Sequence, residues 1–104
     1  MKLPGNINMQ SMMKQAQAMQ ERMQQEIAKI RVEGSAGGGM VIIKMDGQKN
    51  VLGVIIDKEV AGDVEMLQDM VMASSNDAVK KVEEQTQKIM GGMMGGMGLP
   101  AGLL

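Results

Sequence analysis

Hydrophobic residues near the start of the chain recur at intervals of three and four positions, between about Asn8 and Ile30. This spacing is the period of one face of an α-helix, and the segment contains neither Gly nor Pro. Asn8 is a suitable residue to cap the first free amides. The pattern predicts a helix of about five to six turns. Its apolar stripe consists of Met9, Met12, Ala16, Met19, Met23, Ile27 and Ile30.

The hydrophobic period then changes to two, which is typical of half-buried strands. Three consecutive glycines at 37–39 favour a loop, because their backbone is too free to hold regular structure. Asp46 and Gly47 favour a hairpin turn. The pattern predicts three short strands in an antiparallel meander. These strands are Arg31 to Ser35, Met40 to Met45 and Val51 to Ile56.

Helical spacing returns after Gly62 and predicts a second helix that ends at about Ile89. Asp63 can accept hydrogen bonds from its first free amides, and Glu65 suits the positive end of its dipole. Ser74 is the one polar member of the apolar face. That face consists of Val64, Leu67, Met70, Val71, Ser74, Ala78, Val82 and Ile89. The predicted order is helix, three-stranded meander, helix, which is an α+β fold.

The chain divides into three predicted regions. Residues 1–8 form a flexible N-terminus, residues 9–89 form a single α+β domain, and residues 90–104 form a mobile tail of mainly Met, Gly and Leu. Ordering so glycine-rich a tail is entropically costly. No apolar run reaches the roughly 20 residues of a membrane span, and the start of the chain lacks the core of a secretory signal. We therefore expect a cytoplasmic protein without a membrane partner.

The composition excludes most catalytic chemistry. The 104 residues include 15 Met and 14 Gly but no His, Cys, Phe, Tyr or Trp. The chain therefore has no thiol or imidazole nucleophile, no usual zinc site, and no aromatic rings on which single-stranded bases could stack. Carboxylates such as Asp57 and Glu59 lack a neighbouring nucleophile. We expect no enzyme activity, cofactor, metal or small-molecule substrate, and binding through charge, amides and methionine.

A single copy of this fold would be only marginally stable. About 80 ordered residues without aromatic side chains build a small core, and a three-stranded sheet leaves an unpaired edge. Both helices also extend beyond strands of six residues. These features predict a symmetric homodimer joined by sheet edges and helix stripes. The residues predicted to serve the core or the dimer are Met12, Met19, Met23, Ile27, Val54, Leu67 and Val71.

Several segments taken together carry a family resemblance. They are Met13 to Gln24 (MKQAQAMQERMQ), the strand Arg31 to Ser35, the turn at Asp46 and Gly47, Val54 with Ile56 and Asp57, Asn76 to Ala78 within Met66 to Met90, and the Gly-Leu-Pro tail. In this order they resemble the YbaB/EbfC nucleoid-associated proteins of bacteria. The resemblance implies a homodimer shaped like tweezers, with helices projecting from a shared sheet, that binds double-stranded DNA and organises the nucleoid. A role in gene regulation stays open.

The charge distribution is compatible with this resemblance. The net charge is −1, but residues 1–33 carry +2, residues 34–77 carry −4, and residues 78–104 carry +1. The two helical ends are thus basic, and the acidic middle is expected to face away from DNA. Few cations per protomer predict salt-sensitive binding with little sequence preference.

Polar residues away from the apolar stripes are the candidates for DNA contact. Cations there can meet phosphates, and Gln side chains can pair with adenine edges. The candidates are Lys14, Gln17, Arg22 and Lys29 in the first helix and Asn76 and Lys80 in the second. Arg22 and Lys29 share one outward flank. Lys81 and Lys88 are instead spaced to pair with Asp77 and Glu84. For each candidate, the alternative is a plain solvated side chain, and for Asn76 a second alternative is a contact that braces the dimer.

The methionines leave two other functions open. Met90, Met93, Met94 and Met97 lie close together in the tail, and thioethers bind Cu(I). The absence of His and Cys argues against copper, and most other methionines have the helical spacing of core residues. The second alternative is an adaptor, in which Met-rich helices hold a protein of replication, recombination or repair, because thioether surfaces repack around different partners.

Overall fold

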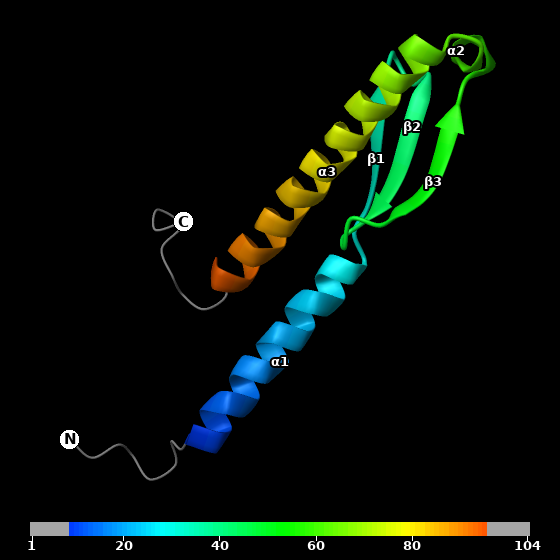
Figure 1. Cartoon of the computed structure of the whole chain (residues 1–104). Coiled ribbons are helices and arrows are strands. Elements are labelled where there is room, and N and C mark those ends of the chain that lie inside the picture. Colours follow the sequence, from blue (N-terminus) through cyan, green and yellow to red (C-terminus); the bar gives the residue numbers. More distant parts are fainter. Residues whose placement is uncertain (1–8, 96–104) are drawn as a thin grey trace.

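The computed structural model describes residues 9–95 and confirms the predicted order of elements (Figure 1). Its elements are α1 (Met9–Ala28), β1 (Arg31–Ala36), β2 (Val41–Asp46), β3 (Val51–Ile56), α2 (Lys58–Ala61) and α3 (Val64–Gly95). The N-terminus 1–8, including the Asn8 cap, and residues 96–104 of the tail lie outside the described residues. The α+β prediction is correct.

Two details of the helices differ from the sequence prediction. The long helix α3 continues to Gly95 instead of ending near Ile89. A glycine in a helix costs about 1 kcal/mol relative to alanine, but an established helix adds residues cooperatively, so the weak helix formers after Ile89 still join it. The short helix α2 was not predicted. Asp57 caps it by accepting the Glu59 amide at 2.9 Å, and its Val60 is buried.

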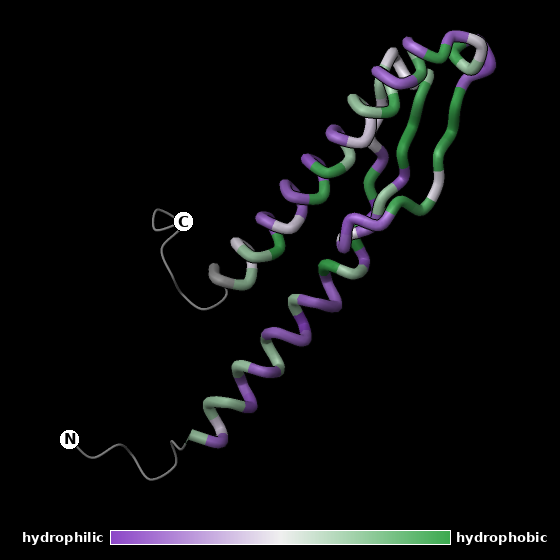
Figure 2. Tube along the Cα trace, in the orientation of Figure 1, coloured by the Kyte–Doolittle hydropathy of each residue, from purple (hydrophilic) through white to green (hydrophobic). Residues whose placement is uncertain are grey.

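The three strands form an antiparallel sheet in the order β1-β2-β3, and α3 packs across β1 and β2 on one face (Figure 1). Alternate residues of the central strand point into this contact, so Val41, Ile43 and Met45 are buried. Ala78 and Val82 of α3 form one cluster with Ile43 and Met45. Figure 2 shows hydrophobic residues concentrated on β2 and β3 and alternating with hydrophilic ones along α3, whereas α1 is largely hydrophilic. The core therefore lies between α3 and the middle of the sheet.

At Gly34, α3 lies too close to the sheet to leave room for a side chain. A methyl group at this position would collide with the backbone oxygen of Ser74 and with the backbone nitrogen and Cβ of Ala78. Ser74 is fully buried, and its hydroxyl donates to the Val71 carbonyl at 3.2 Å. The prediction that Ser74 belongs to the buried face is confirmed. Small residues on both elements let the helix lie directly on the strand.

Two side chains of α3 occupy the outer edge of β1. The Ser35 amide donates to the Asp77 carboxylate at 3.0 Å, and the Lys81 ammonium donates to the Glu33 carbonyl at 2.8 Å. Lys81 also pairs with Asp77 at 3.1 Å, as the spacing predicted. The pair predicted between Lys88 and Glu84 is not among the ion pairs of the described residues, because exposed side chains gain little from pairing. We call Asp77 and Lys81 the edge clamp.

The edge clamp predicts a loss of stability in acid. The Ser35 amide, followed by the hydrogen bond from Lys81, holds the pKa of Asp77 below its ordinary value of 3.8. A carboxylate whose pKa is lower in the folded state than in the unfolded state stabilises the fold above about pH 4. This stabilisation is lost as the pH falls through the folded-state pKa. We expect the urea concentration at the midpoint of unfolding, measured by far-UV circular dichroism, to decrease as the pH is lowered below about 4. Asp77→Asn should make this decrease smaller.

The matched control for this acid titration is Asp69→Asn, which changes an exposed aspartate of the same helix. The slope of the Asp69 variant should follow that of the unmodified protein. Equal slopes for the Asp77 variant and the unmodified protein would contradict the role of the edge clamp.

The predicted turn at Asp46 and Gly47 is present and holds the end of α1. The Asp46 carboxylate accepts the backbone amides of Gln48 and Asn50, both at 2.9 Å. These bonds, with that of Asn50 the largest cause, lower the pKa of Asp46. A Cβ at Gly47 would collide with the Ile27 carbonyl, so the turn lies directly against the last turn of α1.

An arginine completes the joint between α1 and the sheet. One guanidinium nitrogen of Arg31 donates to the carbonyls of Ala28 and Ile30, both at 2.8 Å. These carbonyls lie at the C-terminus of α1, where no helical donors follow. These bonds act beside apolar contacts, because Ile30 is buried in the core and Ile27 packs against it. Together they set the direction in which α1 leaves the sheet.

Beyond this joint, α1 projects as an arm (Figure 1). The molecule measures 72 × 26 × 15 Å, and no residue of α1 is buried. None of the seven residues predicted for core or dimer belongs to the buried core of one protomer: Met12, Met19 and Val54 are 57%, 36% and 50% exposed, and the other four are half-buried. A core role is therefore wrong for the three exposed residues, and their role in a dimer stays a prediction. No helix within 9–95 is long and apolar enough to cross a bilayer.

Candidate nucleic-acid interface

The first candidate residues lie along the exposed arm. Lys14 and Gln17 belong to a stretch of α1 in which every side chain is exposed. Within residues 9–95, Lys14 takes part in no ion pair. An ammonium group without a carboxylate partner, on a projecting helix, is available to a phosphate oxygen.

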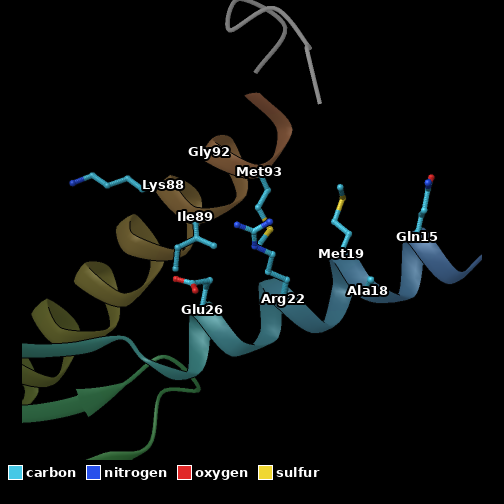
Figure 3. A pocket seen from close by; sticks show the side chains of 9 residues that line it. All are labelled: Gln15, Ala18, Met19, Arg22, Glu26, Lys88, Ile89, Gly92 and Met93. Carbon is cyan, nitrogen blue, oxygen red and sulfur yellow. The ribbon is translucent and has the colours of Figure 1, made fainter. Parts of the chain in front are cut away.

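Arg22 occupies a different surface from the one predicted. It was expected on an outward flank of α1, but its side chain points toward α3 (Figure 3). The reason is the direction of α1, which turns this flank of the helix to face the C-terminal part of α3. Arg22 is still exposed and has no ion pair in the part of the chain that the structure describes.

Lys29, at the base of the arm, pairs with Glu26 at 3.3 Å. Both side chains are substantially exposed, so the pair contributes about 0–1 kcal/mol. An approaching phosphate could therefore compete with Glu26 for the ammonium group. Lys29 remains a candidate, but a weaker one than Lys14.

Asn76 and Lys80 are exposed on α3. They flank Ala78, whose backbone lies against Gly34 of the sheet, so this part of α3 is held firmly. The structure therefore places the six candidates in three regions: the arm, the space between α1 and α3, and the part of α3 that packs on the sheet. One protomer does not bring them together into a single patch.

The space between α1 and α3 is a groove with a volume of about 740 Å³. Met19 and Arg22 point into it from α1, and Ile89 and Met93 point into it from α3 (Figure 3). Its lining consists of Gln15, Ala18, Met19, Arg22, Glu26, Lys88, Ile89, Gly92 and Met93. Sequence reasoning missed this site. A signal was present in α1, because Gln15, Met19, Arg22 and Glu26 have helical spacing, but the sequence does not show that α3 faces them.

Comparison with known proteins identifies the family. The model of the YbaB/EbfC DNA-binding family matches residues 5–97. A nucleoid-associated protein of Koribacter versatilis is 47% identical to this chain, over 92% of the chain and 97% of the relative. A nucleoid-associated protein of Bacillus licheniformis is 55% identical, over 89% of the chain and 92% of the relative.

The fold is also found in a solved structure. The crystal structure of an uncharacterized protein from Helicobacter pylori matches with a TM-score of 0.71 and 22% identity, over 86% of this chain and 99% of that one. This likeness supports the architecture alone. The family model and the curated relatives cover most of the sequence, and the family is one of DNA-binding proteins rather than enzymes. The chain therefore belongs to the YbaB/EbfC DNA-binding family.

Proposed function

We propose that this protein binds double-stranded DNA as a homodimer with little sequence preference and contributes to the organisation of the nucleoid, where it resides. The observation that carries the proposal is the arm α1, an exposed helix without any buried residue in a chain of a DNA-binding family. An arm that meets its own core only at its base, through Ile27, is well suited to contact another molecule. Lys14 and Lys80 supply cations without carboxylate partners in the described residues, whereas Arg22 points into the space between α1 and α3 (Figure 3).

The homodimer is supported by the surface of β3. Five of its six residues are apolar and between 40% and 54% exposed. These are Val51, Leu52, Val54, Ile55 and Ile56. Their ladder partners show that they lie on both faces: Val54 and Ile56 are opposite the buried Ile43 and Val41, whereas Ile55 is opposite Ile42 on the other face. A strand that is apolar on both faces normally lies inside a sheet, not at its edge.

The two edges of the sheet differ, and the difference favours β3 as the dimer edge. The edge clamp occupies the outer amide of Ser35 and the outer carbonyl of Glu33 on β1. On β3, no side chain of the described residues makes an equivalent bond to the strand backbone. Pairing of two β3 strands would therefore join two three-stranded sheets and bring both arms into one molecule.

Salt dependence tests the proposed DNA binding. Two cations per protomer outside the groove, Lys14 and Lys80, or about four per dimer, predict a slope of about −4 for log K against log salt concentration. Between 50 and 200 mM salt, we expect the affinity for a duplex to fall by about two hundredfold. Fluorescence anisotropy with duplexes of different sequence should give similar affinities. An affinity that does not change with salt would contradict phosphate contact.

Two matched double variants locate the contact. Lys14→Gln with Lys80→Gln removes four proposed phosphate contacts per dimer, so the slope should become shallower by about 3 to 4 units. Lys44→Gln with Lys58→Gln changes the net charge equally, but at exposed lysines of β2 and α2, and should leave the slope unchanged. If both pairs weaken DNA binding equally, net charge alone explains the affinity and the proposed interface is wrong.

A further inference from the structure

The groove between α1 and α3 has apolar walls. Met19 projects into it from the arm, and Ile89 and Met93 project into it from α3 (Figure 3). Ala18 and Gly92 also line it. A groove between two helices with aliphatic and thioether side chains is the usual receptor for the apolar face of a third helix. Methionine walls adapt to such a ligand because the thioether side chain is flexible and polarizable.

The charges in the groove restrict what can enter. Glu26 pairs with Lys29 at 3.3 Å, so its carboxylate already has a partner. The Lys88 side chain points away from the groove (Figure 3). Arg22 alone points into it without an ion pair in residues 9–95. A guanidinium group beside apolar walls is matched by a carboxylate, which it can bind through two parallel hydrogen bonds.

We propose that this groove binds an amphipathic helix of another protein, with the apolar face of that helix on Met19, Ile89 and Met93 and an acidic residue on Arg22. The proposal goes beyond DNA binding and does not depend on it. A phosphate backbone fits the groove poorly, because it would place charged oxygens against apolar walls.

A second copy of this chain matches the groove less well than a different protein does. In its exposed helix α1, the carboxylate of Glu26 pairs with Lys29, and a guanidinium group would have to replace that partner. Glu21, the other acidic residue of α1, lies on the face opposite the apolar stripe by helical periodicity. We therefore place the apolar face with a carboxylate beside it on a different protein, and a second copy of the chain is one outcome of the test.

The absence of aromatic residues makes a direct test possible. The probe is a helical peptide of about 15 residues with Leu at helical spacing, one Glu beside that stripe, and a single Trp on it. Full-length protein labelled with ¹³C at the methionine methyl groups is titrated with this peptide. Because the only aromatic ring is in the probe, ring-current shifts identify the methionines next to it. We expect shifts for Met19 and Met93, and none for the exposed Met66 and Met72 near the other end of α3.

Charge exchange tests the role of Arg22. Arg22→Glu should lower the affinity for the peptide at least about tenfold. A peptide with Lys in place of its Glu should bind this variant with restored affinity. Lys14→Glu, on the same helix but outside the groove, is the matched control and should bind the original peptide normally.

Four results would overturn the proposal. They are unshifted Met19 and Met93 signals, equal weakening by Arg22→Glu and Lys14→Glu, equal shifts on addition of a DNA duplex, and the same shifts on raising the protein concentration without peptide. The third would assign the groove to DNA, and the fourth to a second copy of the chain.

Discussion

Gly34→Ala should destabilise the protein by roughly 3 kcal/mol and lower its melting temperature by more than about 10 °C. The new methyl group would overlap the backbone oxygen of Ser74 and the backbone nitrogen of Ala78. Two of the three obstructing atoms belong to the backbone of α3, so no rotamer change relieves the overlap. The helix must move away from β1, which opens the core around Ala78 and Val82. Thermal unfolding followed by far-UV circular dichroism measures the effect.

The matched control is Gly53→Ala in β3. A Cβ there would lie 3.7 Å from the nearest atom, the Cδ of Lys44, which is an ordinary contact. The Gly53 variant should melt within a few degrees of the unmodified protein. Adding Ala78→Gly to Gly34→Ala should not restore stability, because the backbone overlaps remain. Full rescue by that second change would show that the side chain of Ala78, not the backbone of α3, limits the approach.

Val54→Lys should convert the proposed dimer into monomers. Val54 is 50% exposed in one protomer, so the monomer tolerates the change, and its circular dichroism spectrum should keep its shape. In a dimer joined through β3, two ammonium groups would enter the contact between apolar strands without partners. A buried unpaired charge costs several kcal/mol, so the dissociation constant should rise by at least about a thousandfold. Sedimentation equilibrium over a range of protein concentrations measures the change.

Val64→Lys is the control for this interface. Val64 is 62% exposed at the start of α3, so the same substitution there leaves β3 intact. The molecular mass measured by sedimentation equilibrium should remain that of a dimer. A Val54→Lys protein that remains dimeric, or a Val64→Lys protein that dissociates, would contradict pairing through β3.

Hydrophobic periodicity predicted the elements well, because burial dictates the pattern in β2 and along most of α3. Val41, Ile43 and Met45 alternate with less buried residues, and the strand lies where the alternation indicates. The predicted elements were wrong where a periodic pattern of buried residues does not determine the structure. The helix α2 depends on one capping aspartate and one buried valine, Val60, which is too short a pattern to recognise. The end of α3 was misplaced because glycine composition underestimates how far an established helix continues.

The candidate site was less predictable than the fold. Helical projection correctly gave the exposed positions of Lys14, Asn76 and Lys80, since exposure depends only on the period of the helix. It could not show which exposed flank faces α3, because that depends on the direction in which α1 leaves the sheet. This direction is set by Arg31 and by the contact of Gly47 with Ile27, and neither contact leaves a periodic signal in the sequence.

The edge clamp also has a consequence for how far assembly can proceed. A sheet with two open edges can add copies at both ends, and such head-to-tail growth leads to filaments. Here Asp77 and Lys81 occupy one amide and one carbonyl of the β1 edge from within the same chain. Two copies that pair through β3 would present only these partly occupied β1 edges to a third copy. The Asp77 carboxylate and the Lys81 ammonium group would thus disfavour growth of the assembly beyond two subunits.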